Sequence, residues 1–387
     1  MFSWPTIDTA TLRKWRTQRV HALMDEHHLD HLVITSVDNI RYATDYRTQL
    51  AGENYDWFAA VIDGDRAAHV FLPWVDEVAS VTDPAIPTVQ SVHPLPSWTP
   101  AVPHASFWAS SLASVMPGAR RIGYELLYPE ILDALKVHFP DADYVPIATE
   151  LYDMRIVKHP SEIVLLEATG AVNANAAARG LEAAQPGMTD YDILAVIAED
   201  TQRAGVEIIS HGLCNHRRGT GTWFAEGTVL REGDPFFFDV GCYGKGGYAS
   251  DIARTGFVGE PPKAVREAYA VLMEAYQVGQ DAARPGVKAS SVHNRVNGFL
   301  DAKGYPRTPY SMGHGVGLRL CELPTIHRAD RMARDQVLIE GSVIALEPET
   351  GVEVDGEFML LKIEDNFVVE SDGLRMLSVP TSVLAKP

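Results

Sequence analysis

Four acidic residues occupy positions where a carboxylate is costly. Asp239 and Glu347 each come directly after a run of apolar residues that reads as a buried strand. Asp251 follows the first of them and Glu364 the second, in both cases across glycines that suit a turn. A buried carboxylate is unfavourable unless it is paired or binds a metal. We therefore expect two pairs of acids on neighbouring strands, converging on cations.

A pair of divalent metal ions is the simplest group that such a set of acids could hold. Four carboxylates in one place cannot all be ionised without a cation, and two divalent ions would neutralise them. The imidazole of His314 is the expected nitrogen ligand, because Gly313 and Gly315 let the backbone approach a crowded centre. An oxygen-rich set with one imidazole suits manganese first, and otherwise iron, cobalt or zinc. Such a centre can activate water and polarise a carbonyl.

A repeat in the second part of the chain supplies the elements that would place these acids. The segment AQPGM at 184–188 is echoed 99 residues later by ARPGV at 283–287. Glu-Gly, an apolar run and then an acid recur at 232–239 and 340–347. Alone, an acid at a strand end would be a turn residue and His314 a core histidine, but the repetition favours a shared site. Two copies of one α/β unit predict a pseudo-twofold domain.

The residues before this repeat read as a separate α/β region. Apolar positions at helical spacing over 12–23 predict a helix, and residues 131–138 predict another. Residues 83–106 are rich in Pro, Ser and Thr and predict a loop. Short β-rich runs predict strands at 31–35, 58–62, 68–72 and 121–124.

The boundary between the two parts is expected near residue 155. Pro160 ends an extended segment, and Ser161 is the expected N-cap of a long Ala-rich helix that runs to about Ala184. The prediction is an α/β (α+β) protein with an N-terminal domain at residues 1–155 and a catalytic, metal-binding domain at 156–387.

Length, charge and cysteine content narrow the function further. The 387 residues carry 33 Lys and Arg against 51 Asp and Glu, and the formal net charge of −18 would repel nucleic acid and anionic lipid. The N-terminus has neither a basic start nor an apolar region, and no apolar stretch is long enough to span a membrane. Three cysteines are too few for a disulfide framework. We expect a cytoplasmic protein whose partners are neither nucleic acids nor membranes.

Several motifs at these positions match a known family. They are DVG at 239–241, GYASDIART at 247–255, GHGVGL at 313–318, ELP at 322–324, LEP at 346–348 and IED at 363–365. RIVKHPSEI at 155–163 also looks like the family's hinge between two domains. In these motifs the sequence resembles the pita-bread metallopeptidases, which include prolidase, aminopeptidase P, methionine aminopeptidase and the metal-free creatinase. The resemblance implies a creatinase-like N-terminal α/β domain, a pseudo-twofold pita-bread catalytic domain and a homodimer.

The resemblance also assigns a role to each acid. It implies that Asp239 chelates one metal ion and that Asp251 and Glu364 bridge the two ions. His314 and Glu347 would bind the second ion. Glu347 or Glu364 would also shuttle the proton during hydrolysis. Creatinase-type members have lost several of these acids, whereas this sequence has all five ligands, so we expect it to bind metal.

Two histidines that the peptidases usually carry are replaced in this sequence. Cys321 stands where a second histidine usually follows the ligand histidine by seven residues, and Thr222 where another usually precedes the first Asp by seventeen. The nearest upstream imidazoles are His211 and His216. A shifted loop could bring in His216, which we take, together with Cys321, as a candidate catalytic residue.

Two functions remain as alternatives to an Xaa-Pro dipeptidase or aminopeptidase that hydrolyses small peptides or amides. The missing histidines favour a non-peptidase member acting on a small, often cationic metabolite, with Glu322 or a histidine as base. Such a member would be creatinase-like or dimethylsulfoniopropionate-lyase-like. The spacing from Asp239 to Asp251 resembles that lyase branch, although the branch has a further acid where Gly241 stands. A non-catalytic binding module is the third alternative, and absence of bound metal would favour it.

Candidate substrate-binding residues come from two regions. Arg47 could take a substrate carboxylate through two hydrogen bonds, and Trp57 lies in the same region. Arg47 could equally be a solvated surface residue, and Trp57 a core residue. Arg319 and His327 follow the ligand histidine and are further candidates. The expected partner is therefore a small molecule or a dipeptide.

Overall fold

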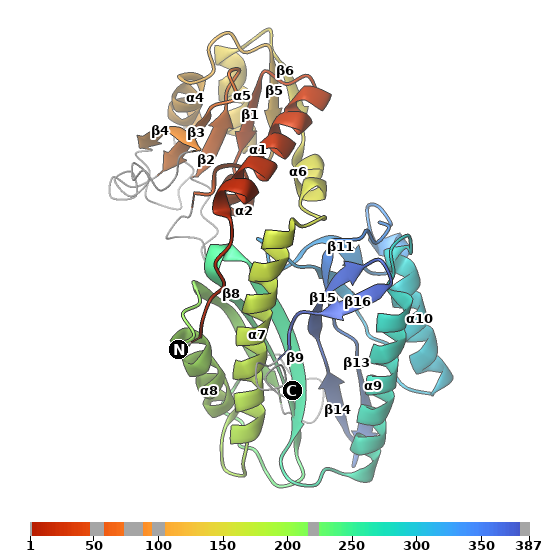
Figure 1. The fold of residues 1–387 in the computed structure, drawn as a ribbon. Coiled ribbons are helices and arrows are strands. Elements are labelled where there is room, and N and C mark those ends of the chain that lie inside the picture. Colours follow the sequence, from red (N-terminus) through yellow and green to blue (C-terminus); the bar gives the residue numbers. More distant parts are fainter. Residues whose placement is uncertain (1, 47–57, 73–87, 95–104, 216–223, 380–387) are drawn as a thin grey trace. The chain divides into compact units, whose positions relative to one another are not determined.

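The chain forms two compact units. The computed structural model describes residues 2–46, 58–72, 88–94, 105–215 and 224–379. One unit comprises Asp8–Met154, and the other comprises Met1–Ile7 together with Arg155–Pro387. Figure 1 shows a sheet with flanking helices in the first unit, and two long helices over strands in the second. The predicted α/β (α+β) architecture is confirmed.

The unit Asp8–Met154 is built on a mixed sheet in the order β4-β3-β2-β1-β5-β6. Strand β1 pairs antiparallel with β2 and parallel with β5. Its strands are β1 (His31–Ile34), β2 (Ala59–Ile62), β3 (Ala68–Leu72), β4 (Val89–Pro94), β5 (Arg121–Tyr124) and β6 (Asp143–Pro146). Its helices are α1 (Thr9–Glu26), α2 (Val37–Thr44), α4 (Ala105–Ala113), α5 (Pro129–His138) and α6 (Ala148–Met154). Val33, Trp108, Ile122 and Leu135 belong to its buried core.

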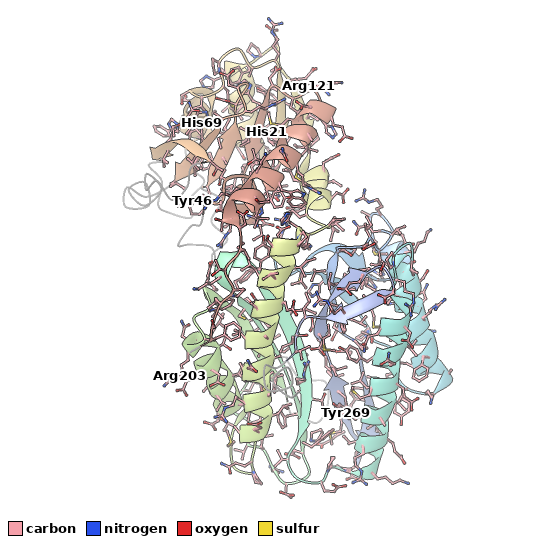
Figure 2. All side chains as sticks on the ribbon, in the orientation of Figure 1. His21, Tyr46, His69, Arg121, Arg203 and Tyr269 are labelled. Atoms are coloured by element: carbon pink, nitrogen blue, oxygen red, sulfur yellow. The ribbon has the colours of Figure 1, made fainter. Side chains whose placement is uncertain are left out.

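Strand β4 corrects the loop predicted for residues 83–106. It pairs in parallel with β3, and the ring of His69 on β3 lies 2.6 Å from Ser91 Oγ on β4. His69, labelled in Figure 2, is also held by Asp63 at 2.9 Å. Strand β4 forms because β3 supplies its hydrogen-bond partners. The local excess of Pro and Ser gives no information about that pairing.

The second unit contains two copies of one arrangement. Its helices are α7 (Pro160–Ala183), α8 (Asp190–Arg203), α9 (Lys263–Ala282) and α10 (Ala289–Ala302). Its first strands, β7 (Ile208–Asn215), β8 (Pro235–Tyr243) and β9 (Ala249–Phe257), form one sheet. A second sheet has the order β11-β10-β12-β15-β16, and β13 pairs with β14 as a hairpin. These strands are β10 (Gly313–Gly315), β11 (Glu322–Ile326), β12 (Val343–Leu346), β13 (Glu349–Val354), β14 (Glu357–Lys362), β15 (Asp365–Glu370) and β16 (Gly373–Met376).

The turns of the two copies correspond as the repeat predicts. Gly187 lies between α7 and α8 with φ +93°, and Gly286 lies between α9 and α10 with φ +84°. Gly233 and Gly341 have φ +87° and +83° just before β8 and β12. A side chain would strain the backbone in this left-handed region, so glycine fits all four turns. The pseudo-twofold domain is therefore confirmed.

The long helix of the second unit begins two residues earlier than predicted. Helix α7 starts at Pro160, and its N-cap is His159, whose side chain accepts a hydrogen bond from the Ser161 backbone N–H. Ser161 is therefore not the N-cap. Proline suits the first helical position because that position needs no N–H donor.

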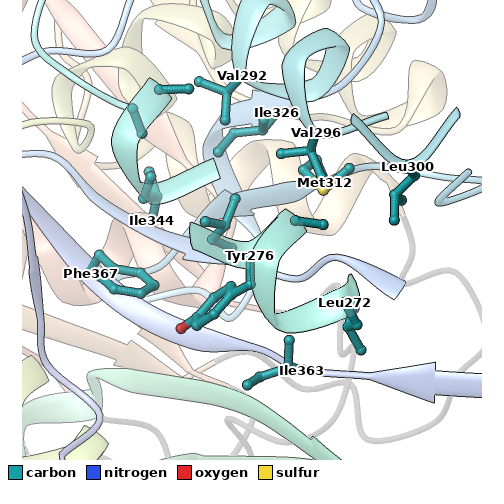
Figure 3. Packing of buried hydrophobic residues seen from close by; sticks show 14 of the residues in the cluster. Leu272, Tyr276, Val292, Val296, Leu300, Met312, Ile326, Ile344, Ile363 and Phe367 are labelled. Carbon is teal, nitrogen blue, oxygen red and sulfur yellow. The ribbon is translucent and has the colours of Figure 1, made fainter. Parts of the chain in front are cut away.

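A buried cluster holds the second half of this unit together (Figure 3). Leu272 and Tyr276 on α9 pack with Ile344 on β12 and Phe367 on β15. The hydroxyl of Tyr276 donates to Asp365 Oδ2 at 2.7 Å. Since Asp365 begins β15, this contact ties the helix layer to the strand that follows Glu364. The core thus fixes the strands that carry the site.

Candidate metal centre

The first half-site stands on the β8–β9 ladder. Asp239 is in β8, and Asp251 in β9 pairs with Gly241. Residues 239 and 241 share one face of a strand, because successive side chains alternate. Asp239 and Asp251 therefore point to the same side of the sheet, and each is only 5% exposed.

The second half-site stands on the β12–β15 ladder. Leu346 pairs with Asp365, so Glu347 and Glu364 lie directly beyond the last pair on the same edge. Glu364 N–H donates to Ala253 O at 3.0 Å, and this bridge joins the edge to β9 of the first half. The two halves thus meet at the acids.

The glycines around His314 allow the crowding that places its ring. A Cβ on Gly313 would lie 2.1 Å from Ala345 O, and a Cβ on Gly315 would lie 2.1 Å from Leu323 O. No side chain fits at such distances. Between them, His314 Nδ1 bonds the Gly315 carbonyl at 3.0 Å, which leaves Nε2 for the cluster.

The structure brings all five predicted metal ligands together. His314 Nε2 lies 3.5 Å from Asp251 Oδ2, 3.9 Å from Glu347 Oε1 and 3.8 Å from Glu364 Oε1. His314, Glu347 and Glu364 form one group whose ligand atoms all lie within 4.8 Å of one another. Asp239 and Asp251 belong to a second such group. The two groups lie where the two halves of the unit meet, and together they match the set of ligands of a dinuclear metal centre.

Buried oxygens without hydrogen bonds support this assignment. Among the residues that the structure describes, Asp251 Oδ1 and both carboxylate oxygens of Glu364 have no hydrogen-bond partner. Glu364 is 1% exposed, so water does not compensate. Lys362 Nζ lies 3.4 Å from Glu364 Oε2 without a hydrogen bond. A buried carboxylate that lacks hydrogen bonds is unfavourable, and divalent cations would satisfy these oxygens. The residues present therefore fit a pair of metal ions.

The pKa values of Glu364 and Asp251 are shifted in opposite directions, because the two acids have different neighbours. Burial, and then the nearby Asp251 carboxylate, raise the pKa of Glu364 well above its ordinary value. Burial alone would also raise the pKa of Asp251, but the nearby imidazoles of His211 and His314 lower it below its ordinary value. Carboxylates that share a site separate their pKa values in this way.

His211 joins the cluster, although His216 is the histidine that we chose from the sequence. His211 Nε2 on β7 lies 2.9 Å from Asp239 Oδ1 and 3.3 Å from Asp251 Oδ1. Burial would lower the pKa of His211, but these two acids raise it to about 10. His216 and Thr222 lie outside the described residues. A shift in the β7–β8 register between Ile209 and His211 sets His211 toward the acids, and the sequence carries no local signal for that shift.

Lys362 is a site residue that sequence reasoning missed. Its Nζ lies 2.6 Å from Asp239 Oδ2, 2.8 Å from Glu347 Oε2 and 3.4 Å from Glu364 Oε2. The residue is 1% exposed at the end of apolar strand β14, two residues before Glu364. The sequence signal for this residue was a lysine at the end of an apolar strand, because a lysine without charged partners is rarely buried. The cluster therefore contains a fixed cation besides its acids.

A further acid borders the cluster beside Lys362. Glu349 is buried two residues after Glu347, and the hydroxyl of Tyr310 donates to its Oε2. Burial raises the pKa of Glu349 to about 7, although the Tyr310 hydrogen bond and Lys362 oppose that rise. Lys362 Nζ lies 5.9 Å from the centre of the Tyr310 ring. This wall of the site is acidic and aromatic.

The candidate catalytic residues Cys321 and Glu322 have different surroundings. Cys321 is exposed, and its Sγ lies 3.6 Å from His314 Nε2. Glu322 is buried, with Lys158 Nζ at 2.6 Å and Arg155 Nη2 at 3.2 Å. Cys321 thus faces the cluster, whereas Glu322 is held in an ion-pair network.

Two of the four candidate substrate-binding residues, Arg319 and His327, lie within the described residues, and both belong to the second unit. Arg319 is exposed between β10 and β11, and its carbonyl accepts from Gly317 N–H at 3.1 Å. The His327 ring follows β11, and its centre lies 5.2 Å from that of His293. Arg47 and Trp57 lie outside the described residues.

Comparison with known proteins gives the family. Residues 165–371, more than half of the chain, match metallopeptidase family M24, and residues 16–157 match the creatinase/prolidase N-terminal domain. The chain belongs to metallopeptidase family M24. It is therefore a metal-dependent hydrolase by family, and the family implies divalent metal ions, for which the structure offers candidate clusters of carboxylates and histidines. The predicted resemblance to pita-bread metallopeptidases is confirmed.

Individual M24 relatives extend over nearly the whole chain. An uncharacterised peptidase, YqhT, of Bacillus subtilis is 27% identical over 94% of this chain and 97% of its own length. The Xaa-Pro dipeptidase of Pyrococcus furiosus is 25% identical over 94% of this chain and 98% of its own. The prolidase structure of Pyrococcus horikoshii has the same fold, with a TM-score of 0.78 at 22% identity, over 95% of this chain and 98% of that one. None of the described helices is long and apolar enough to cross a membrane.

Proposed function

We propose that this M24 member is a dinuclear-metal hydrolase of small peptides, with Xaa-Pro dipeptides as the leading substrate class. The observation that carries the proposal is the convergence of five ligands, with three buried carboxylate oxygens that lack hydrogen bonds, where the two halves meet. The Xaa-Pro dipeptidase of Pyrococcus furiosus, similar over nearly its full length, supports the substrate class. Manganese is the first metal to test, and the proposed setting is a cytoplasmic homodimer.

Asp239, Asp251, Glu347, Glu364 and His314 would hold the two ions. When bound, the ions supply an activated water and polarise the scissile carbonyl. The chain's own residues orient this chemistry. Glu347 is the proposed proton shuttle, because its Oε1 accepts a hydrogen bond from the Ser311 hydroxyl at 3.4 Å, which orients the carboxylate. Lys362 fixes Glu347 from the other side at 2.8 Å.

Recognition of the substrate ends is proposed for residues outside the cluster. Arg47 would bind the free carboxylate through its planar guanidinium, with Trp57 beside it. Arg319 and His327 are the proposed contacts from the catalytic unit. Cys321, whose Sγ lies 3.6 Å from His314 Nε2, stands at the position where a histidine is usual in these peptidases. Glu322 is proposed to position the backbone through Lys158 and Arg155, not to act as a base.

A second function is favoured by the acidic wall and the thiol. Cys321 is a weaker hydrogen-bond donor to a developing oxyanion than a histidine. Glu349 adds an acid beside the cluster, which suits a cationic metabolite. The second candidate is therefore a non-peptidase member acting on a small cationic compound, in the manner of creatinase or a dimethylsulfoniopropionate lyase.

A metal-loaded activity panel separates the two functions. The purified protein is assayed with manganese, cobalt and zinc on Xaa-Pro dipeptides, tripeptides, creatine and dimethylsulfoniopropionate. Cleavage of the Xaa-Pro dipeptides supports the peptidase, and turnover of either cationic compound without peptide cleavage replaces it with the second function. Asp251→Asn should abolish both metal occupancy and turnover, because Asp251 faces both ligand groups. The matched control Asp200→Asn, on the partly exposed face of α8, should keep both.

A further inference from the structure

His211 lies within the carboxylate cluster but belongs to none of the five implied ligand positions. Its Nε2 is 2.9 Å from Asp239 Oδ1 and 3.3 Å from Asp251 Oδ1. His314 Nε2, an implied ligand, lies 3.5 Å from its nearest carboxylate and 3.8 Å or more from the other two. His211 is therefore closer to its acids than His314 is to any of its own.

These separations match those between ligands of one ion. Two donors bound at about 2.1 Å are about 3.0 Å apart at a right angle and about 3.4 Å apart at a tetrahedral angle. His211 Nε2 lies at 2.9 and 3.3 Å from its two oxygens. A single N–H would satisfy only one oxygen at a time, and Asp251 Oδ1 indeed has no hydrogen-bond partner among the described residues. An ion would serve all three atoms together.

The position of Lys362 explains why the ion held by Asp239 and Asp251 would need a further ligand atom. Its ammonium occupies Asp239 Oδ2 at 2.6 Å, so only Oδ1 of Asp239 faces His211 and Asp251. The Lys362 hydrogen bond engages Oδ2, which leaves Oδ1 as the Asp239 oxygen most available to an ion on this side. The ion on this side would lack one donor, and His211 is placed to supply it.

The backbone around His211 is shaped to hold the ring in this position. The β7–β8 register shifts between Ile209 and His211, which turns His211 over Gly241. A Cβ on Gly241 would lie 2.5 Å from His211 Cε1 and 2.7 Å from its Nδ1. Any larger residue at 241 would displace the ring. Ser210 Oγ lies 3.2 Å from Nδ1, so the other nitrogen has its own polar partner and Nε2 faces the acids.

We infer that His211 is a metal ligand, and that it completes the coordination of the ion held by Asp239 and Asp251. The inference deepens the proposed function, because it presupposes the dinuclear site. It gives each ion one imidazole, His211 on one side and His314 on the other. A second nitrogen donor shifts the preference of the centre from manganese toward cobalt and zinc.

Metal titration and an imidazole count test this inference without an activity assay. The metal-free protein and its His211→Ala variant are titrated with Co²⁺ and with Mn²⁺ by calorimetry. The zinc-loaded proteins are then compared by X-ray absorption, which counts imidazoles per zinc. His138→Ala removes an exposed imidazole from the other unit and is the matched control. His211→Asp keeps a ligand but removes the ring.

The expected wild-type result is two ions and, on average, one imidazole per zinc. In His211→Ala the count should fall to one for every two zinc ions, and one Co²⁺ binding step should weaken at least tenfold while Mn²⁺ binding changes less. His211→Asp should restore affinity but not the count. A wild-type protein with two ions and one imidazole in total overturns the assignment of His211 alone. A protein that binds no ions at all overturns the dinuclear site itself.

Discussion

The ammonium of Lys362 donates a 2.6 Å hydrogen bond to Asp239 Oδ2, although the two residues come from opposite halves of the repeat. The same ammonium donates to Glu347 Oε2 at 2.8 Å. Burial alone would lower the pKa of Lys362, but the charges of Glu364, Glu347 and Asp239 raise it well above its ordinary value. The lysine is therefore charged at neutral pH, and it acts as a permanent counterion among acids that also fit metal.

Replacing Lys362 tests this counterion role. Lys362→Met should lower the unfolding free energy of the metal-free protein by about 3 to 5 kcal/mol, because buried acids lose their partner. Lys362→Arg keeps the charge and should recover most of that loss. Denaturant titration with and without metal gives the measurement. The loss should be smaller when metal is bound, and an equal loss in both states would contradict the counterion role.

Glu322→Gln distinguishes an ion-pair partner from a catalytic base. The change leaves Lys158 and Arg155 buried with a neutral partner, and we expect a loss of about 3 to 5 kcal/mol in unfolding free energy. Turnover per folded, metal-loaded molecule should change little. Thermal unfolding and kcat are measured on the same preparation. A stable variant with kcat reduced a hundredfold would instead restore Glu322 as a base.

The three thiols should differ in reactivity toward alkylating reagents. Burial, and then the charge of Asp190, raise the pKa of Cys214 to about 12. Burial, and then Asp251, raise the pKa of Cys242 to about 12 as well. Both thiols stay protonated at pH 8, and the thiolate is the reactive form, so neither should react in the native protein. Exposed Cys321 should react.

Mass spectrometry after iodoacetamide treatment at pH 8 checks this order. One label per chain, located on Cys321, is expected in the native protein and three in denaturant. Cys321→Ser should give no label in the native state. Labelling of Cys242 in the folded protein would show that the β8–β9 ladder opens.

The stability of the metal-free protein should fall as the pH rises above neutrality. The acids raise the pKa of His211 from 6.5 to about 10, although burial opposes them. A raised folded-state pKa stabilises the fold fully below pH 6.5, and this contribution is lost as the pH rises toward 10. Denaturant titrations of the wild-type and His211→Gln proteins with chelator, from pH 6 to 10, give the comparison. The two curves should converge at high pH.

Much of the fold is predictable because local chemistry specifies it. The Pro-Gly turns at 186–187 and 285–286 require left-handed glycines, and both copies have them. Strand β4 is not predictable in this way, since its stability comes from pairing with β3 and from the His69–Ser91 contact. Likewise, His159 as N-cap depends on where Pro160 places the first turn. Contacts made at a distance decide these cases.

The acids of the site are predictable, but their other neighbours are not. Asp239 and Glu347 end apolar strands, which is a local signal. The approach of Lys362 to Asp239 depends on how β14 crosses to β8, and the approach of His211 depends on a shift in the β7–β8 register. A register shift redirects side chains without any change in composition. The sequence therefore indicated the acids of the site, but it did not indicate that the ammonium of Lys362 lies among them.

The bridge between Ala253 and Glu364 joins the two halves of the repeat at the residues that fit metal. Each residue belongs to a different half of the repeat, and the two exchange both backbone hydrogen bonds, at 3.0 and 3.3 Å. Contacts between distant parts of a chain form late in folding, because a long loop must close first. Neither half alone presents both ligand groups. The complete donor set therefore requires both halves of the repeat, so metal binding would report that the two halves have come together.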